Sequence, residues 1–270
     1  MHICYIPVSS KFMSEKPMSD HHSYKPLTGN QSRSRGIYLL PNLFTTAALF
    51  AGFYAIVQAM NGHFELSAVA IFVAMVLDGL DGRVARLTHT QSAFGAEYDS
   101  LSDMVSFGVA PALIAYVWAL KGLGKLGWMA AFVYCVGAAL RLARFNTQID
   151  VADKRYFQGL PSPAAAALVA GLVWVMNEYG VVGNDVKWLA FAVTLFAGLT
   201  MVSNVRYYSG KDINLRRSVP FVVVFLIAMG FVLVAYSPPE ILFGVVTLYA
   251  LSGYANSGWL WLRRNKTVAK

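Results

Sequence analysis

Apolar segments of about 20 residues recur along most of this chain, and they decide what it can fold into. Of its 270 residues, 57% are hydrophobic and only 13% are charged, whereas a soluble domain carries about 25% charged residues. A helix needs roughly 20 mostly apolar residues to cross a bilayer. The sequence therefore predicts an all-α, polytopic membrane helix bundle of about eight transmembrane helices, at residues 39–60, 65–86, 98–120, 126–145, 162–179, 187–204, 219–236 and 240–262.

The basic residues predict the orientation of this bundle. If the N-terminus is cytoplasmic, every lysine and arginine except Lys121, Lys125 and Lys187 falls on the cytoplasmic side. This asymmetry follows the positive-inside rule, and an even number of spans places both termini in the cytoplasm. The net charge of +8 is thus explained by the membrane, and we expect no nucleic-acid partner.

The chain divides into three regions by composition. Residues 1–36 are polar and predict a disordered or interfacial cytoplasmic N-terminal tail. Residues 37–211 contain the first six expected spans, and residues 212–270 contain two additional C-terminal spans and a short basic tail.

Four aspartates lie inside this apolar sequence, in the segment DGLDGRVARLTHTQSAFGAEYDSLSD (78–103). A carboxylate at membrane depth costs several kcal/mol unless something compensates it, so such residues are functional candidates. Asp78 and Asp81 are three residues apart and Asp99 and Asp103 are four apart, so each pair shares one helix face. Two such helices packed as a hairpin would bring four carboxylates to one point. Because hard divalent cations prefer oxygen ligands, the sequence predicts a metal site there.

Small and basic residues at helical spacing indicate what this metal site handles. Gly82 follows the first aspartate pair and lets a ligand approach the helix backbone, and Ala85 keeps the same face shallow. Arg86, one turn from Gly82, is placed to pair with a phosphate. Gly95, one turn before the second pair, allows the two helices to pack closely. Since two metal ions about 3.5–4 Å apart are the usual clamp for displacement at phosphorus, these residues predict a phosphate-handling site with a nucleotide-sized notch.

Two other classes of protein also place carboxylates in a membrane. An ion- or proton-coupled transporter would use the aspartates as a relay, but it would not explain why Gly, Ala and Arg share their helix face. Such a transporter would move a substrate across vesicles and release no nucleotide. A structural membrane scaffold would tolerate replacement of the aspartates by alanine.

Together these positions form the pattern DxxDGxxARx8GxxxDxxxD, which the chain matches at every fixed position between residues 78 and 103. In this the chain resembles the CDP-alcohol phosphatidyltransferase family. Its members are integral membrane enzymes that transfer a phosphatidyl or related group from a CDP-linked donor to an alcohol and release CMP. The resemblance implies that residues 37–211 form the family core and that the protein is a homodimer.

The same resemblance implies roles for the residues of the motif. Two divalent cations, Mg²⁺ or Mn²⁺, would be held by the four aspartates, and Asp103 would also act as general base on the acceptor hydroxyl. The CDP group would be bound by Asp78, Asp81, Gly82, Ala85, Arg86 and Gly95.

Stretches outside the motif bear on the acceptor alcohol. LLPNLFTTAALFAGFYAI (39–56), SFGVAPA (106–112), RLARFN (141–146), FQGLPSPAAA (157–166) and MVSNVRYYSGK (201–211) are similar to members whose acceptor is L-serine. The resemblance thus implies CDP-diacylglycerol and L-serine as substrates, in a bacterial inner (cytoplasmic) membrane with the active site facing the cytoplasm. Glycerol 3-phosphate or an inositol phosphate remains an alternative acceptor. Candidates for binding the acceptor or a phosphate are Asn42, Thr45, Arg141, Arg144, Asn146 and Lys211.

Overall fold

The computed structural model describes residues 39–147, 156–208 and 221–268, and in this part of the chain nearly every residue is helical. The helices are α1 (Leu39–Met60), α2 (Phe64–Thr88), α3 (Ala93–Asp103), α4 (Ala110–Trp118), α5 (Lys125–Thr147), α6 (Ser162–Glu178), α7 (Lys187–Val202), α8 (Phe221–Tyr236) and α9 (Pro238–Val268). A π-helical turn, η2 (Met104–Val109), joins α3 to α4, and a 3₁₀ turn, η3 (Leu120–Leu123), precedes α5. Strands β1 (Tyr156–Gln158) and β2 (Arg206–Tyr208) form an antiparallel pair in which Phe157 lies opposite Tyr207.

The predicted all-α class is confirmed, with α3, η2 and α4 forming one continuous rod among eight in the described residues. Helix bounds agree with the predicted segments within a few residues, except that the third rod begins at Ala93 and α9 continues to Val268. Three stretches, Leu40–Met60, Ala93–Trp118 and Lys125–Thr147, are long and apolar enough to cross a membrane. Helices α6, α7 and α8 are apolar but shorter. The predicted N-terminal tail, residues 1–36, lies outside the described residues.

Helix α1 packs along α2 and buries a stripe of small side chains. Ala48, Ala51, Ala55 and Ala59 recur every three or four residues and are all buried. Small residues let helix backbones approach closely where the surrounding lipid gives no hydrophobic drive to associate. Ser67, three turns before the aspartates of α2, donates a hydrogen bond to the Ala55 carbonyl oxygen (2.6 Å) and ties the two helices together at that end.

The third rod changes its helix type directly after Asp103, where α3 gives way to η2. Pro111 has no N–H to donate to the carbonyl group of Phe107, four residues before it. The buried Tyr134 hydroxyl of α5 donates to that carbonyl oxygen instead (3.0 Å). π turns are rare and frequently occur at functional sites, so this turn marks Asp103, the residue directly before it, as a functional candidate.

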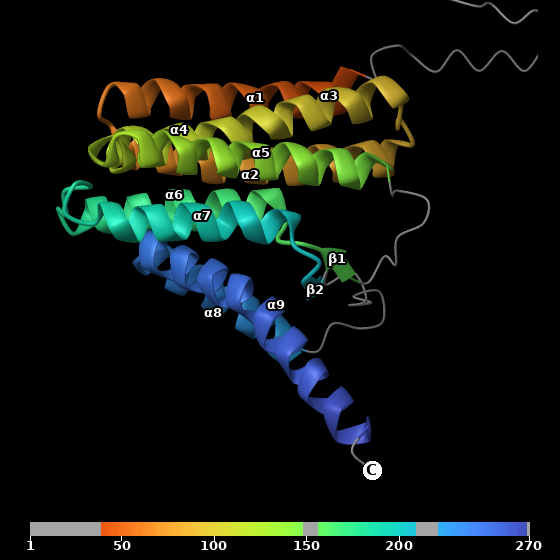
Figure 1. Cartoon of the computed structure of the whole chain (residues 1–270). Helices are drawn as coiled ribbons and strands as arrows, with labels where there is room; N and C mark the ends of the chain where they lie inside the picture. The colour runs from red at the N-terminus through yellow and green to blue at the C-terminus, as the bar shows by residue number, and fades with distance from the viewer. Residues whose placement is uncertain (1–38, 148–155, 209–220, 269–270) are drawn as a thin grey trace, which may run out of the picture. The chain divides into compact units, whose positions relative to one another are not determined.

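Helix α6 forms the centre of the bundle. Its residues from Ala165 to Val175 are all buried, as expected for a helix that is apolar on every side. It packs against α2, α4, α7 and α9. In Figure 1 the axes of α1 to α7 are roughly aligned, whereas α9 crosses α6 at an angle. By contrast, α8 buries none of its residues, which suits a helix that faces lipid.

Helices α5 and α7 cross where two glycines face each other. A Cβ atom on Gly137 would lie 2.5 Å from the carbonyl oxygen of Gly198, so the contact has no room for a side chain. We predict that Gly137→Ala lowers the free energy of unfolding by about 1–3 kcal/mol, because overpacking forces the backbones apart. Gly230→Ala in α8 is the control, since nothing lies within 4 Å of its Cβ position. The measurement is thermal unfolding in detergent, and equal midpoints for the two variants would contradict this account of the crossing.

Candidate active site

The turn between α2 and α3 folds the two aspartate pairs against each other. Helix α2 is followed by His89, which adopts the left-handed conformation (φ 54°) common at helix C-termini. Helix α3 begins after Ser92, whose hydroxyl accepts a hydrogen bond from the Gly95 N–H (3.0 Å). A serine at this N-cap position satisfies one of the unpaired N–H groups of the first helical turn. The chain therefore reverses within a few residues and sets Asp78 opposite Asp99 and Asp103.

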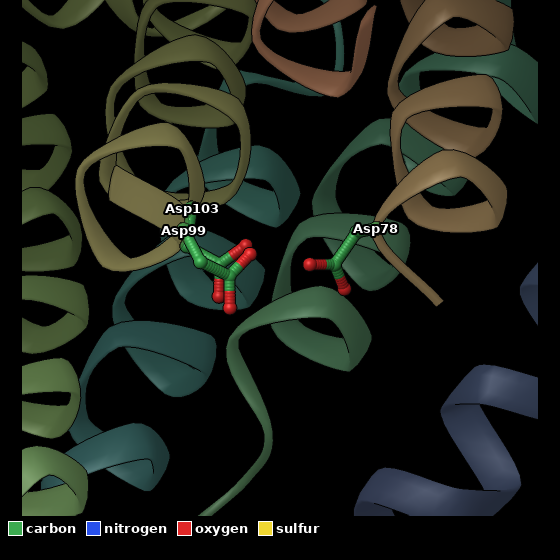
Figure 2. Close-up of side chains that lie close together, drawn as sticks. All are labelled: Asp78, Asp99 and Asp103. Atoms are coloured by element: carbon green, nitrogen blue, oxygen red, sulfur yellow. The ribbon is translucent and has the colours of Figure 1, made fainter. Parts of the chain in front are cut away.

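Three of the four aspartates converge. One carboxylate oxygen from each of Asp78, Asp99 and Asp103 lies within 4.8 Å of the other two. Figure 2 shows Asp99 and Asp103 extending from α3 toward Asp78 on the facing helix. Like charges this close repel strongly in a low-dielectric setting, so the arrangement calls for a cation. Asp99 Oδ1 fits that requirement, since it is buried and has no hydrogen-bond partner among the described residues.

Asp81 is placed differently from the other three. Its side chain is buried, and its Oδ2 accepts a hydrogen bond from the Thr45 hydroxyl of α1 (2.7 Å). Beside it lies Asp99, and both carboxylates border the same cavity. Asp99 therefore belongs to two groups at once, the three converging carboxylates and the wall of the cavity.

This cavity, of about 400 Å³, lies at the ends of α1, α2, α3 and α5. It is lined by Pro41, Asn42, Thr45, Asp81, Gly82, Ala85, Arg86, Thr90, Gln91, Ser92, Gly95, Ala96, Asp99 and Phe145. Of the six residues predicted to bind CDP, five line this cavity and one, Asp78, does not. The space next to Gly82 is open, because nothing lies within 4 Å of the position of a Cβ atom there. The cavity thus combines a shallow helix face, an arginine and two carboxylates.

Asn42 and Thr45, which were predicted to bind the acceptor or a phosphate, line this cavity as well. The sequence analysis missed Phe145 and the polar residues of the turn, Thr90, Gln91 and Ser92. The run of polar residues THTQS between two helices was the signal available for the turn. Phe145 had no such signal, because its spacing does not show which helix it faces.

A second group of polar residues, on α5 and α6, lies near Asp103. Arg141 of α5 donates a hydrogen bond to the Ser162 hydroxyl at the start of α6 (2.7 Å), and its charge acts on Asp103. Two other guanidinium nitrogens, Arg141 Nε and Arg144 Nη1, are buried and have no hydrogen-bond partner among the described residues. Buried guanidinium nitrogens of this kind fit an anionic ligand such as a carboxylate or phosphate.

Two acceptor candidates remain, Asn146 and Lys211, and the described residues show neither at a comparable anion-binding position. The Asn146 amide donates to the Ser100 hydroxyl (3.0 Å), so this side chain ties α5 to α3. Lys211 lies outside the described residues. Sequence analysis did not identify Ser162 or Ser100, whose roles depend on contacts between distant helices.

Clustered carboxylates beside a cavity of about 400 Å³, in a bundle of apolar helices, are the arrangement expected of a membrane enzyme that acts on phosphate groups. The chain matches the profile of the CDP-alcohol phosphatidyltransferase family over residues 38–200. A Helicobacter pylori protein named CDP-diacylglycerol–serine O-phosphatidyltransferase is 38% identical over 226 residues, which cover 84% of this chain and 93% of the relative. A protein of the same name from Methanocaldococcus jannaschii is 34% identical over 68% of this chain and 80% of its own length. Another, from Saccharomyces cerevisiae, is 34% identical over 66% of this chain and 65% of its own length.

The chain therefore belongs to the CDP-alcohol phosphatidyltransferase family, as its motif led us to expect. Enzymes of this family are generally dependent on divalent metals, and the acidic cluster supplies ligands for them. Membership also agrees with the apolar, membrane-length helices of the fold.

We predict that Asp99→Asn weakens Mn²⁺ binding by about 10-fold or more, because it removes the charge shared by the cluster and the cavity wall. Binding is measured by electron paramagnetic resonance of free Mn²⁺ on purified protein. Glu97→Gln is the matched control, since Glu97 is an exposed carboxylate of the same helix outside the cluster. Equal Mn²⁺ affinity in the two variants would remove Asp99 from the cation site.

Proposed function

We propose that this protein transfers the phosphatidyl group of CDP-diacylglycerol to the hydroxyl group of L-serine, giving phosphatidylserine and CMP. The observation that carries the proposal is the convergence of Asp78, Asp99 and Asp103 beside a cavity lined by the Gly, Ala and Arg of the same motif. The printed names of the relatives support serine as the acceptor, since the match to the Helicobacter pylori protein extends over most of both chains.

Two divalent cations, Mg²⁺ or Mn²⁺, would be held by Asp78, Asp81, Asp99 and Asp103. When bound, such cations neutralise phosphate oxygens and stabilise the negative charge of a leaving phosphate. The Thr45 hydroxyl orients the carboxylate of Asp81, and the buried Asp99 Oδ1 has no hydrogen-bond partner among the described residues that would compete with a cation.

The residues of the chain would carry the remaining steps. Gly82, Ala85 and Arg86 bind the CMP portion of the donor in the cavity, with Gly95 behind it. Asp103 accepts the proton of the serine hydroxyl as the serine oxygen attacks the β-phosphorus. A new oxygen–phosphorus bond forms, the bond from this phosphorus to the bridging oxygen breaks, and CMP leaves with that oxygen. Catalysis then comes mainly from positioning and charge neutralisation, with no covalent enzyme intermediate.

The acceptor would bind on the side of Asp103 that faces α5 and α6. Arg141 is anchored by Ser162, and Arg144 has a buried nitrogen available to bind the serine carboxylate. A bidentate guanidinium–carboxylate pair fixes orientation as well as charge, which an attacking hydroxyl requires.

In the membrane, we place eight spans with both termini in the cytoplasm and the active site facing the cytoplasm. Residues 37–211 form the core, and 212–270 add two spans and a basic tail. The distribution of basic residues supports this orientation. A bacterial inner (cytoplasmic) membrane and a homodimeric assembly complete the proposal.

The proposed reaction is tested by the release of CMP from CDP-diacylglycerol when different acceptors are offered separately. Purified protein with Mn²⁺ should release CMP with L-serine and not with glycerol 3-phosphate, inositol or inositol phosphate. EDTA should stop the release, and added Mn²⁺ should restore it. Asp103→Asn is the matched control, because it should still bind CDP-diacylglycerol and release no CMP. Release with another acceptor and not with serine would overturn the assignment of serine.

The acceptor pocket makes a separate prediction. Arg144→Ala should raise the KM for serine by about 10-fold or more with little change in the KM for CDP-diacylglycerol, because a charge-assisted hydrogen bond to the carboxylate is lost. Arg83→Ala is the control, since Arg83 is exposed on α2 and does not line the cavity. An unchanged KM for serine in the Arg144 variant would place the serine carboxylate elsewhere.

A further inference from the structure

Helix α1 carries none of the four aspartates, yet it contacts both helices that do. The Ser102 hydroxyl of α3 donates a hydrogen bond to the Thr45 carbonyl oxygen (3.1 Å). The hydroxyl of the same threonine donates to Asp81 Oδ2 (2.7 Å). One residue of α1 therefore joins the second aspartate-bearing helix to a carboxylate of the first.

Further contacts between α1 and the third rod repeat this link. One turn beyond Ser102, the Ser106 hydroxyl in η2 donates to the Ala48 carbonyl oxygen (3.1 Å). Gly52 makes this approach possible, since a Cβ atom there would collide with the Ser106 side chain. On the exposed side, Thr46 Oγ1 and the Tyr98 hydroxyl share a hydrogen bond (2.9 Å).

The two buried serines differ from other hydroxyl residues of the same bundle. Ser100, Thr46 and Thr88 donate to the carbonyl group four residues earlier in their own helices, at 2.7 to 3.1 Å. That bond is the usual choice for a hydroxyl in a helix, because it needs no partner element. Ser102 and Ser106 donate instead to α1, and both are almost fully buried. Their bonds therefore hold the axial position of one helix relative to another.

We propose that Ser102 and Ser106 are positioning residues that, through α1 and Thr45, fix the register of α3 against α2 and so set the spacing of the carboxylates. The inference rests on the proposed function, in which those carboxylates bind the cations. Ser102 immediately precedes Asp103, and Ser106 lies within the π turn that begins after it. Three carboxylates within 4.8 Å repel one another, so without this hold α3 would slide or rotate to separate them.

The test compares Ser102→Ala and Thr45→Val with Ser67→Ala. The control is closely matched, because Ser67 is also a buried serine whose hydroxyl donates to a carbonyl of α1, three turns from the aspartates. Mn²⁺ affinity is measured by electron paramagnetic resonance without substrate, and stability by thermal unfolding in detergent. Both serine variants should lose similar stability, whereas only Ser102→Ala should weaken Mn²⁺ binding, by about threefold to 10-fold. Thr45→Val should weaken it by about 10-fold or more, because it releases a cation ligand directly.

The double variant tests whether the two residues act along one path. If Ser102 acts through Thr45, its substitution should add little to the effect of Thr45→Val on Mn²⁺ affinity. Half-maximal CMP release by Ser102→Ala should also require more Mn²⁺ than that by Ser67→Ala, which corrects for the stabilisation that Mn²⁺ gives any folded variant. If Ser102→Ala does not fold, Ser106→Ala takes its place in the test. It removes the neighbouring bond to the Ala48 carbonyl oxygen and should show the same loss of Mn²⁺ affinity.

The outcomes separate the two proposals. Wild-type protein that binds no Mn²⁺ and releases no CMP would overturn the proposed function, and this inference with it. Wild-type protein that binds Mn²⁺, together with a Ser102→Ala affinity equal to that of Ser67→Ala, would overturn the positioning role alone.

Discussion

The repulsion among carboxylates held inside an apolar bundle is the constraint around which this structure is arranged. One carboxylate oxygen from each of the partly buried Asp78, Asp99 and Asp103 lies within 4.8 Å of the other two, which is unfavourable unless a cation is shared. The tight turn between α2 and α3 brings them together, and the crossing contacts of α1 keep them there. A site of this kind is destabilising in the absence of its ligand, so the neutral, closely packed remainder of the bundle must provide the stability.

Helices α1, α2 and α3 supply most of the cavity lining, including the glycines and Arg86, and α5 adds Phe145. Helices α5 and α6 also supply the linked pair Arg141 and Ser162. Helix α9 packs against α6 through Phe243 and Gly171, and it is tied to β2 because the Tyr207 hydroxyl donates to the Ala250 carbonyl oxygen.

The sequence predicted the helices and the acidic cluster because both are encoded locally. Apolar length set the bounds of α1, and Pro161 and Pro163 set the start of α6. Helical spacing predicted which aspartates share a face. Contacts such as Thr45 with Asp81 and Arg141 with Ser162 could not be predicted, since they depend on which helices become neighbours. One of these unpredicted contacts, that of Thr45, holds Asp81 in its place beside Asp99.

The most direct test of the central claim is anomalous diffraction from crystals of the protein grown with Mn²⁺ and CMP. The account predicts a manganese peak in contact with carboxylate oxygens of Asp78, Asp99 and Asp103, and CMP in the cavity beside Gly82 and Arg86. A structure in which manganese binds elsewhere while these three side chains remain together would contradict it.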